Sequence, residues 1–292
     1  VRAGENIVIA TNNDSAYAGA FELAQAGASV QILDARKSIP DAIRAQAADA
    51  HAALRTGTAP LMAHGAKGIT ALDIAEQQAA NWREAGKTDC DLLLVSGGWS
   101  PVVNLLSHRG VKPVWDADLA CFVPGQTNEP LSMAGSAAGV WNDNACLLSG
   151  QAAAERAVTH LGGAQGSTAT PAPGGWQGAI TPLYEVSVPG RQLKSFVDPQ
   201  HDVTTEDVRL AHREGYVSVE HLKRYTTLGM AADQGKMGNI IGLALMAEAL
   251  GKEIPQVGTT TFRPPYTPVS LGALKGRNVG NHFRALRRTP LH

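Results

Sequence analysis

The first part of the chain alternates short apolar runs with polar turns and Ala-rich stretches. The run NIVIA ends at Ala10, a polar turn follows from Thr11 to Ser15, and an Ala-rich helical stretch runs from Tyr17 to Gln25. A second β-branched run, SVQILDAR, comes after Gly27. Strand, helix and strand in this order predict a β-α-β unit and therefore a parallel sheet.

Helix and strand signals continue to alternate up to a double glycine. A helical pattern runs from about Ile39 to Leu54, and GITALDIAE indicates a strand or an extended segment. The apolar strand within CDLLLVSGGWSP ends at Gly97 and Gly98. We therefore expect an α/β fold, in which a parallel or mixed sheet carries helices on its faces.

The pattern changes at a segment rich in Gly, Pro, Ser and Thr, from Gly162 to about Pro189, which cannot bury enough apolar surface to form a core. Beyond it, helical patterns begin at Thr204, Ser218 and Ile240. The expected parts are an α/β region, a Gly/Pro/Ser-rich linker, a small helical domain and an extended segment, at residues 1–162, 163–194, 195–254 and 255–292.

Composition and charge exclude several classes of partner. Lysine and arginine number 25 against 26 acidic residues, a formal net charge of −1, which leaves no basic field for a nucleic-acid backbone. No apolar run approaches the roughly 20 residues that cross a bilayer, so we expect a cytoplasmic protein without membrane contact. The chain opens at Val1 without methionine and ends without a helix cap, which indicates truncation at both ends.

The cysteines carry no metal-site signal. Cys90, Cys121 and Cys146 lie far apart, and they form no ligand spacing with the nine histidines. We expect them to be small buried hydrophobic side chains, and we predict no metal ligand in this chain.

The β-α-β unit contains part of a dinucleotide-binding pattern. Asp34 stands near the end of the second strand, where such units place an acidic residue. The turn lacks the glycines of that pattern, and Asp14 would put negative charge beside a phosphate. A structural unit that binds no nucleotide is therefore the alternative interpretation.

The double glycine and a later glycine form a second nucleotide signal. Gly97, Gly98 and Gly135 would permit close backbone approach, and a helix expected to begin near Val140 would aim its N-terminal amides at phosphate or ribitol oxygens. An ordinary strand, turn and helix start would give the same pattern.

A third signal is the segment EHLKRYTTLGMAADQGK, in which cations, hydroxyls and an aromatic ring surround a glycine-punctuated turn. Such side chains suit the phosphate and the ring of a flavin. The cations alone are equally typical of a solvated helix face. The side chains concerned are His221, Lys223, Arg224, Tyr225, Thr226, Thr227, Gln234 and Lys236.

Four segments, ATNNDSAYAGAFELAQAG, LLLVSGGWSPVVNLL, EHLKRYTTLGMAADQGK and GTTTFRPPYTPVSLGAL, resemble the alpha subunit of heterotetrameric sarcosine oxidase along nearly the whole chain. The resemblance implies an internal stretch of that subunit, with a disulfide-oxidoreductase-like dinucleotide-binding domain. It implies NAD on this subunit, FAD and covalent FMN on a beta subunit, and further gamma and zinc-containing delta subunits. It also implies a tetrahydrofolate domain beyond residue 292, with glycine, hydrogen peroxide and methylene-tetrahydrofolate as products.

The residues expected to bind cofactors follow from these signals and the resemblance. Those assigned to the nucleotide are Gly97, Gly98, Gly135, Ser136, Trp141 and Asp143. Those assigned to FMN at the interface with the beta subunit are Arg224, Tyr225, Thr226, Thr227, Gln234 and Gly235. No catalytic residue is expected in this chain, because the partner subunit would oxidise the amine.

The small helical domain also resembles the ferredoxin-like [2Fe-2S] module of related amine and opine dehydrogenases. The places of its four cysteines are taken here by Asp198, Gln200, Asp233 and Gly238, so no iron-sulfur cluster is expected. Two other functions stay open at this point. The chain could be the alpha subunit of such a dehydrogenase, which passes electrons to a quinone or another carrier instead of oxygen, or it could be a non-catalytic scaffold whose nucleotide is structural.

Overall fold

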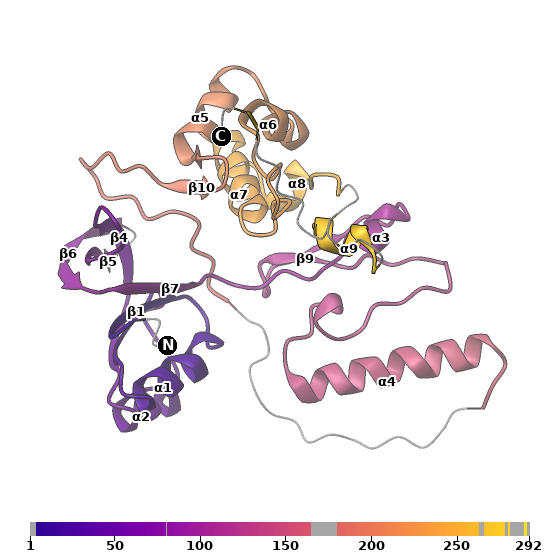
Figure 1. Ribbon diagram of the computed structural model, residues 1–292, viewed down its shortest axis with the longest axis horizontal. Helices are drawn as coiled ribbons and strands as arrows, with labels where there is room; N and C mark the ends of the chain where they lie inside the picture. The colour runs from indigo at the N-terminus through magenta and orange to yellow at the C-terminus, as the bar shows by residue number, and fades with distance from the viewer. Residues whose placement is uncertain are drawn as a thin grey trace. The chain divides into compact units, whose positions relative to one another are not determined.

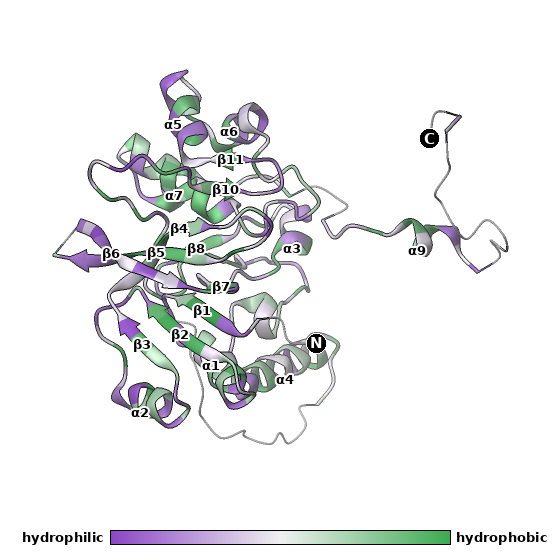
Figure 2. Cartoon of the chain, turned by 60° about the vertical axis from the view of Figure 1, so that its left-hand side comes forward, coloured by the Kyte–Doolittle hydropathy of each residue, from purple (hydrophilic) through white to green (hydrophobic). Residues whose placement is uncertain are grey.

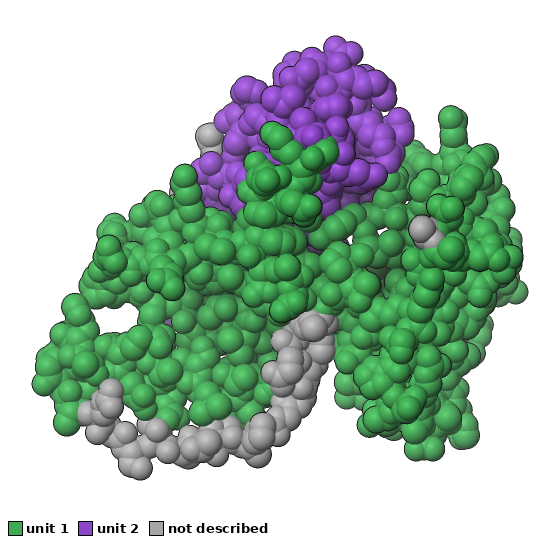
Figure 3. Space-filling model, turned by 180° about the vertical axis from the view of Figure 1, so that it is seen from behind, with its two compact units in different colours: residues 1–195, 251–256 green, residues 196–250, 257–292 purple. Residues whose placement is uncertain are grey.

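The computed structural model describes residues 4–79, 81–164, 180–262, 266–277, 280 and 289–290 (Figure 1). The chain divides into two compact units, which Figure 3 distinguishes by colour. The first comprises residues 1–195 and 251–256, and the second comprises residues 196–250 and 257–292. Residues 165–179, at the centre of the predicted linker, lie outside the described part.

The first unit is built on a four-stranded parallel sheet in the order β3-β2-β1-β7. Ile7 of β1 pairs with Val30 of β2 on one side and with Leu92 of β7 on the other, so the predicted β-α-β unit and parallel sheet are confirmed. The bounds of the strands and of the two helices packed on this sheet are β1 Asn6–Thr11, α1 Ala16–Gln25, β2 Ser29–Asp34, α2 Asp41–Asp49, β3 Ala53–Thr56 and β7 Leu92–Ser96.

Strands β1 and β2 are largely apolar (Figure 2), and the core of this unit lies on both faces of their sheet. Alternate side chains of β1 face opposite ways. Ile7 and Ile9 pack with Tyr17 of α1, whereas Val8 packs with Leu72 of a second sheet. Both faces of β1 are therefore buried, which explains its unbroken apolar sequence.

The second sheet of this unit is antiparallel, in the order β4-β5-β6. Its strands are β4 Thr58–His64, β5 Ala71–Gln78 and β6 Asn81–Asp89. Only β5 was predicted from the apolar pattern. The predicted helix from Ile39 to Leu54 was too long, because His51 has φ of 56° and turns the chain, and Ala53 then pairs with Gln31 of β2.

The rest of the first unit consists of short elements and one long helix: α3 Asn104–His108, β8 Val114–Asp116, β9 Cys121–Val123, the 3-10 helix η1 Gly135–Ala138 and α4 Asp143–His160. The helix expected near Val140 begins three residues later, because the Asn142 side chain accepts a hydrogen bond from Ala145 N at 3.1 Å and caps it. No residue of α4 is buried. No described helix is long and apolar enough to cross a membrane.

The second unit is mainly helical. Its elements are β10 Phe196–Asp198, β11 Val203–Thr204, α5 Thr205–Arg213, α6 Val219–Thr226, α7 Asn239–Leu250 and α9 Leu271–Lys275, and α8 Ile254–Val257 lies at the division of the two units. The predicted cap at Thr204 is confirmed: Thr204 Oγ1 accepts from Asp207 N, and the Asp207 carboxylate accepts from Thr204 N. Predicted starts at Ser218 and Ile240 fall within one residue of α6 and α7.

The three cysteines differ in their surroundings. Cys90 and Cys121 are buried, as predicted, whereas Cys146 is half-buried and its Sγ lies 3.1 Å from Val140 O. Burial raises the pKa of Cys121 to about 12, and burial with the charges of Asp91 and Asp89 raises the pKa of Cys90. Both thiols are therefore protonated at pH 8.

We expect iodoacetamide at pH 8 to label Cys146 on the order of a hundredfold faster than Cys90 or Cys121, because the thiolate is the reacting form. Peptide mass mapping after timed alkylation measures the three rates, and the same reaction in concentrated urea is the control in which they converge. Early labelling of Cys121 in the folded chain would contradict the burial described here.

Candidate functional site

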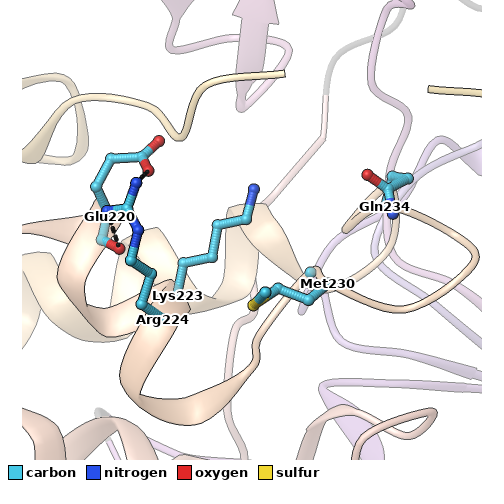
Figure 4. A pocket seen from close by; sticks show the side chains of 6 residues that line it. Glu220, Lys223, Arg224, Met230 and Gln234 are labelled. Carbon is cyan, nitrogen blue, oxygen red and sulfur yellow. Dashed lines mark hydrogen bonds and ion pairs between the residues drawn. The ribbon is translucent and has the colours of Figure 1, made fainter. Parts of the chain in front are cut away.

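A pocket of about 210 Å³ lies in the second unit, between helix α6 and the turn that follows it (Figure 4). It combines two cations, a carboxylate, an amide and a thioether. Its lining residues are Glu220, Lys223, Arg224, Gly229, Met230 and Gln234.

One wall of the pocket is the exposed side of α6. Val219 and Leu222 are buried beneath the helix and fix which side faces outward. Lys223 and Arg224 lie in its last turn, where the helix dipole favours positive charge. Glu220, one turn earlier, belongs to the same wall.

The two cations of this wall differ in how they are bound. Arg224 Nη1 donates to Glu220 O at 3.1 Å, and its Nη2 lies 3.4 Å from the Glu220 carboxylate. That carboxylate also accepts a short hydrogen bond from Thr261 N. No ion pair of Lys223 is found within the described residues, and Figure 4 shows its ammonium extending into the space between the Glu220–Arg224 pair and Gln234. Lys223 is therefore the cation free to meet an anion.

The other wall is the turn from Thr227 to Gln234. Thr227 has φ of 64° and ends α6, Gly229 has φ of 70°, and Gln234 has φ of 53°. The Gln234 side chain folds back, with Nε2 donating to Ala231 O at 2.8 Å. Met230 is 49% exposed and supplies apolar surface. The turn thus presents an amide and a thioether opposite the cations.

Two polar side chains hold this turn in shape, the buried Asp198 and the half-buried Asn239. Asp198, only 3% exposed, accepts hydrogen bonds from Gly229 N at 3.0 Å, Gln200 N at 2.9 Å and His201 N at 3.3 Å. A Cβ atom at Gly229 or Gly235 would lie within 2.4 Å of the Asn239 side chain, so only glycine fits at these two positions. The carboxylate of Asp198 ties strand β10 to the pocket wall.

The residues predicted to bind FMN are only partly brought together. Arg224 and Gln234 both line the pocket, and Gly235 follows directly. Tyr225 instead stacks on Tyr216 with ring centroids 4.5 Å apart. Thr226 Oγ1 donates to Leu222 O, so its hydroxyl serves the helix end.

Sequence reasoning did not select Glu220, Gly229 or Met230 for this site. The spacing of Glu220 and Arg224, four residues apart on a helix, was the signal for their pairing. Gly229 and Met230 sit within the glycine-punctuated turn, but nothing in the sequence alone shows that this turn folds back toward α6.

The residues predicted to bind the nucleotide lie in the first unit. The indoles of Trp99 and Trp141 bring the Gly97–Gly98 turn and the segment before α4 together, with ring centroids 5.9 Å apart. Trp99 is 52% exposed. Gly135 has φ of 60°, and its N–H donates to Ser149 Oγ at 3.1 Å. Ser136 lies in η1, and Asp143 is the first residue of α4.

Asp34, the acidic residue of the dinucleotide-like unit, is completely buried and fully engaged. Arg36 donates to both of its oxygens, and Tyr17 Oη donates to Oδ2 at 2.7 Å. Arg36 also forms an ion pair with Asp14 at 2.7 Å. Burial and the hydrogen bond to Asp34 raise the pKa of Tyr17, and the two carboxylates outweigh the effect of burial on Arg36 and raise its pKa.

Taken together, the parallel sheet with its helices and the small helical unit define an α/β protein with an attached helical domain. The helical domain contains no cysteine. This is the fold class that the sequence predicted.

The chain is similar over its whole length to sarcosine oxidase alpha subunits, and residues 192–277 match the sarcosine oxidase A3 domain family. It is 41% identical over 296 residues to the alpha subunit of Rhizobium meliloti (strain 1021) and 39% identical over 306 residues to that of Corynebacterium sp. (strain P-1). Each match covers 100% of this chain but 29% and 31% of the relative. The chain therefore spans about three tenths of the curated relatives, and the predicted resemblance to this family is confirmed.

Solved structures show weaker likeness. L-proline dehydrogenase from P. horikoshii is 12% identical, with a TM-score of 0.47 over 92% of this chain and 79% of that chain. Thioredoxin reductase from Lactococcus lactis is 18% identical, with a TM-score of 0.41 over 55% of this chain and 52% of that chain.

Proposed function

We propose that this chain is a cofactor-covering part of a sarcosine oxidase alpha subunit. In this proposal the pocket beside α6 meets the phosphate end of an FMN carried by a beta subunit, and the segment from Gly135 to Asp143 contributes to an NAD site. The supporting observation is that the pocket, with the free ammonium of Lys223, lies wholly inside the region 192–277 that matches the A3 domain family.

The residues of the pocket fit an anionic group joined to a partly apolar one. Lys223 offers charge to a phosphate, Gln234 an amide, and Met230 an apolar surface. A volume of about 210 Å³ is below the roughly 300 Å³ at which pockets for whole small ligands begin. The pocket is therefore one side of a site, and we propose that the beta subunit supplies the other side.

The proposed reaction is the oxidative demethylation of sarcosine to glycine, in which the flavins accept electrons from the amine and pass them to oxygen. This chain supplies no catalytic residue in the proposal. Its residues bind and orient cofactors, while the beta subunit with FAD and FMN carries out the oxidation. Gamma and delta subunits and a folate domain that yields methylene-tetrahydrofolate complete the proposed enzyme.

The proposed NAD site rests on the aromatic pair and the segment before α4. Trp99 and Trp141 present an indole surface on which a planar base can stack. The positive φ of Gly135 is a backbone conformation that a larger side chain would strain. Family resemblance, rather than this geometry, selects NAD over other nucleotides.

The proposed role of the pocket predicts unequal effects of its two cations. We expect Lys223→Ala to lower the affinity of the chain for its flavin-carrying partner about tenfold, or ~1.4 kcal/mol, because a charge-assisted hydrogen bond is lost. Arg224→Ala should weaken the same contact less, since Arg224 is already paired with Glu220. Titration of the two subunits, and the flavin absorbance that co-purifies, measure both effects.

Arg213→Ala, an exposed arginine on α5 outside the pocket, is the matched control. Equal affinity for the parent and Lys223→Ala would rule out the anion contact. In the same complex kept free of oxygen, sarcosine should bleach the flavin bands. Flavin that binds but does not bleach would favour an amine dehydrogenase over the oxidase.

A further inference from the structure

The sheet of the first unit has a point at which ligands commonly bind. From β1 the chain continues to β2 and β3 on one side, while β7 lies on the other side. In open parallel sheets the carboxyl ends of two such strands diverge and leave a crevice, which is the usual place for a dinucleotide. Here that crevice lies between the residues after Thr11 and those after Ser96.

Polar side chains from the turn after β1 fill this crevice. Asn12 Nδ2 donates to Gly97 O at 3.1 Å, and Asn13 Nδ2 donates to Ser96 O at 3.1 Å. Thr11 Oγ1 lies 3.2 Å from the same Ser96 carbonyl. Asn12 is 4% exposed and Asn13 is fully buried. These side chains bind the strand ends to each other.

The start of helix α1, where a pyrophosphate would accept hydrogen bonds, is also occupied. Ser15 N donates to Asn13 Oδ1 at 3.0 Å, and Ser15 Oγ donates to the same oxygen at 2.6 Å. Trp99 Nε1 donates to Ser15 Oγ at 2.9 Å and brings its indole alongside. A phosphate would have to displace an internal acceptor and an indole.

A segment distant in sequence pairs with this turn. We name residues 180–191 the strap. Ile180 forms an antiparallel bridge with Asn13, Thr181 N donates to Asn12 O at 3.2 Å, and Ile180 N donates to Asp118 O at 3.1 Å.

The far end of the strap is also held in place. Arg191 Nη1 lies 2.5 Å from Glu84 Oε1 on β6, and Val188 is 8% exposed. The strap is thus attached at both ends to the first unit.

We infer that this crevice is an internal fastening for the strap and is not a nucleotide site. Its strand-end carbonyls, its helix amide and the ribose-binding position of Asp34 are all engaged by the chain itself. To bind here, a dinucleotide would have to break all of these internal hydrogen bonds. Its own hydrogen bonds would then only replace the ones that were lost, so they would add little net affinity. Any nucleotide on this chain therefore binds elsewhere, and this inference does not depend on the proposed function.

Equilibrium dialysis of the chain with NAD and with NADPH, for the parent and for Asp34→Asn, tests the inference. A ribose contact to Asp34 would make Asp34→Asn lose about tenfold or more in affinity. We expect the affinity to change less than twofold while the thermal midpoint falls, because Asp34 serves Arg36 and Tyr17 alone. A tenfold loss at a temperature where the variant is folded would overturn the inference.

Hydrogen exchange at Ile180 and Thr181 gives an independent readout. We expect both amides to be protected and to exchange at the same rate with and without saturating NAD. Faster exchange on adding NAD would show that the strap opens for a ligand and would overturn the inference. If the parent chain binds neither nucleotide, the inference that the crevice is not a nucleotide site stands.

Discussion

Arg36→Ala should lower the free energy of unfolding of the first unit by about 3–5 kcal/mol, because it leaves a buried carboxylate without its counter-charge. Asp34 is fully buried, and the Arg36 side chain is 15% exposed. The substitution also removes the partner of Asp14. Urea unfolding followed by circular dichroism measures the loss as a shift of the midpoint.

Two further variants make this result specific. Arg83→Ala breaks the exposed pair with Glu76, in which the two side chains are 56% and 44% exposed, and should cost less than about 1 kcal/mol. Adding Asp34→Asn to Arg36→Ala should recover part of the loss, since the unpaired charge disappears. A double variant no more stable than Arg36→Ala alone would refute the charge explanation.

Asp198→Ala should destabilise the second unit by about 3 kcal/mol, since three backbone N–H groups lose a buried acceptor. The turn carrying Gly229 loses its tie to β10, so the pocket wall should open and flavin-partner binding should fall with stability. Denaturation of the chain and hydrogen exchange at Gly229 measure the two effects.

Asp202 is an exposed residue of the turn between β10 and β11, and Asp202→Asn removes one negative charge without changing the hydrogen bonds of Asp198, so it should leave both readouts unchanged. Asp198→Asn keeps one acceptor oxygen, so its stability and the protection of its Gly229 amide should lie between those of Asp198→Ala and of the parent. Normal protection of the Gly229 amide in Asp198→Ala would show that other contacts hold the turn.

Much of the fold follows from local patterns in the sequence. The β-branched runs at β1 and β2 are buried on both faces, and such runs stand out in any sequence. Strand β4 is hard to predict because Pro60 interrupts its apolar run, and β6 is hard to predict because most of its residues are polar or charged and every position is exposed or half-buried. Both strands pair with β5, their neighbour in sequence, but only the folded chain shows that these segments form hairpins.

The candidate site was less predictable for a similar reason. The sequence shows that α6 carries cations, but it does not show how they differ. That difference depends on Glu220, which pairs with Arg224 and accepts a hydrogen bond from Thr261, forty-one residues further on. The sequence predicts only that Asp198 replaces a cluster cysteine, whereas its role as hydrogen-bond acceptor for Gly229 N requires the folded turn. Asp34 looked like a nucleotide ligand until Arg36 and Tyr17 were placed around it.

Strand β7 lies at the edge of its sheet, with Val95 70% exposed and Leu94 36% exposed. An apolar edge strand with unpaired backbone groups is a template onto which another strand can add. Two copies of this chain that met along β7 would gain hydrogen bonds and bury valine and leucine together. Mass action then links apparent stability to protein concentration, so unfolding midpoints of variants are comparable only when all are recorded at one common, low concentration.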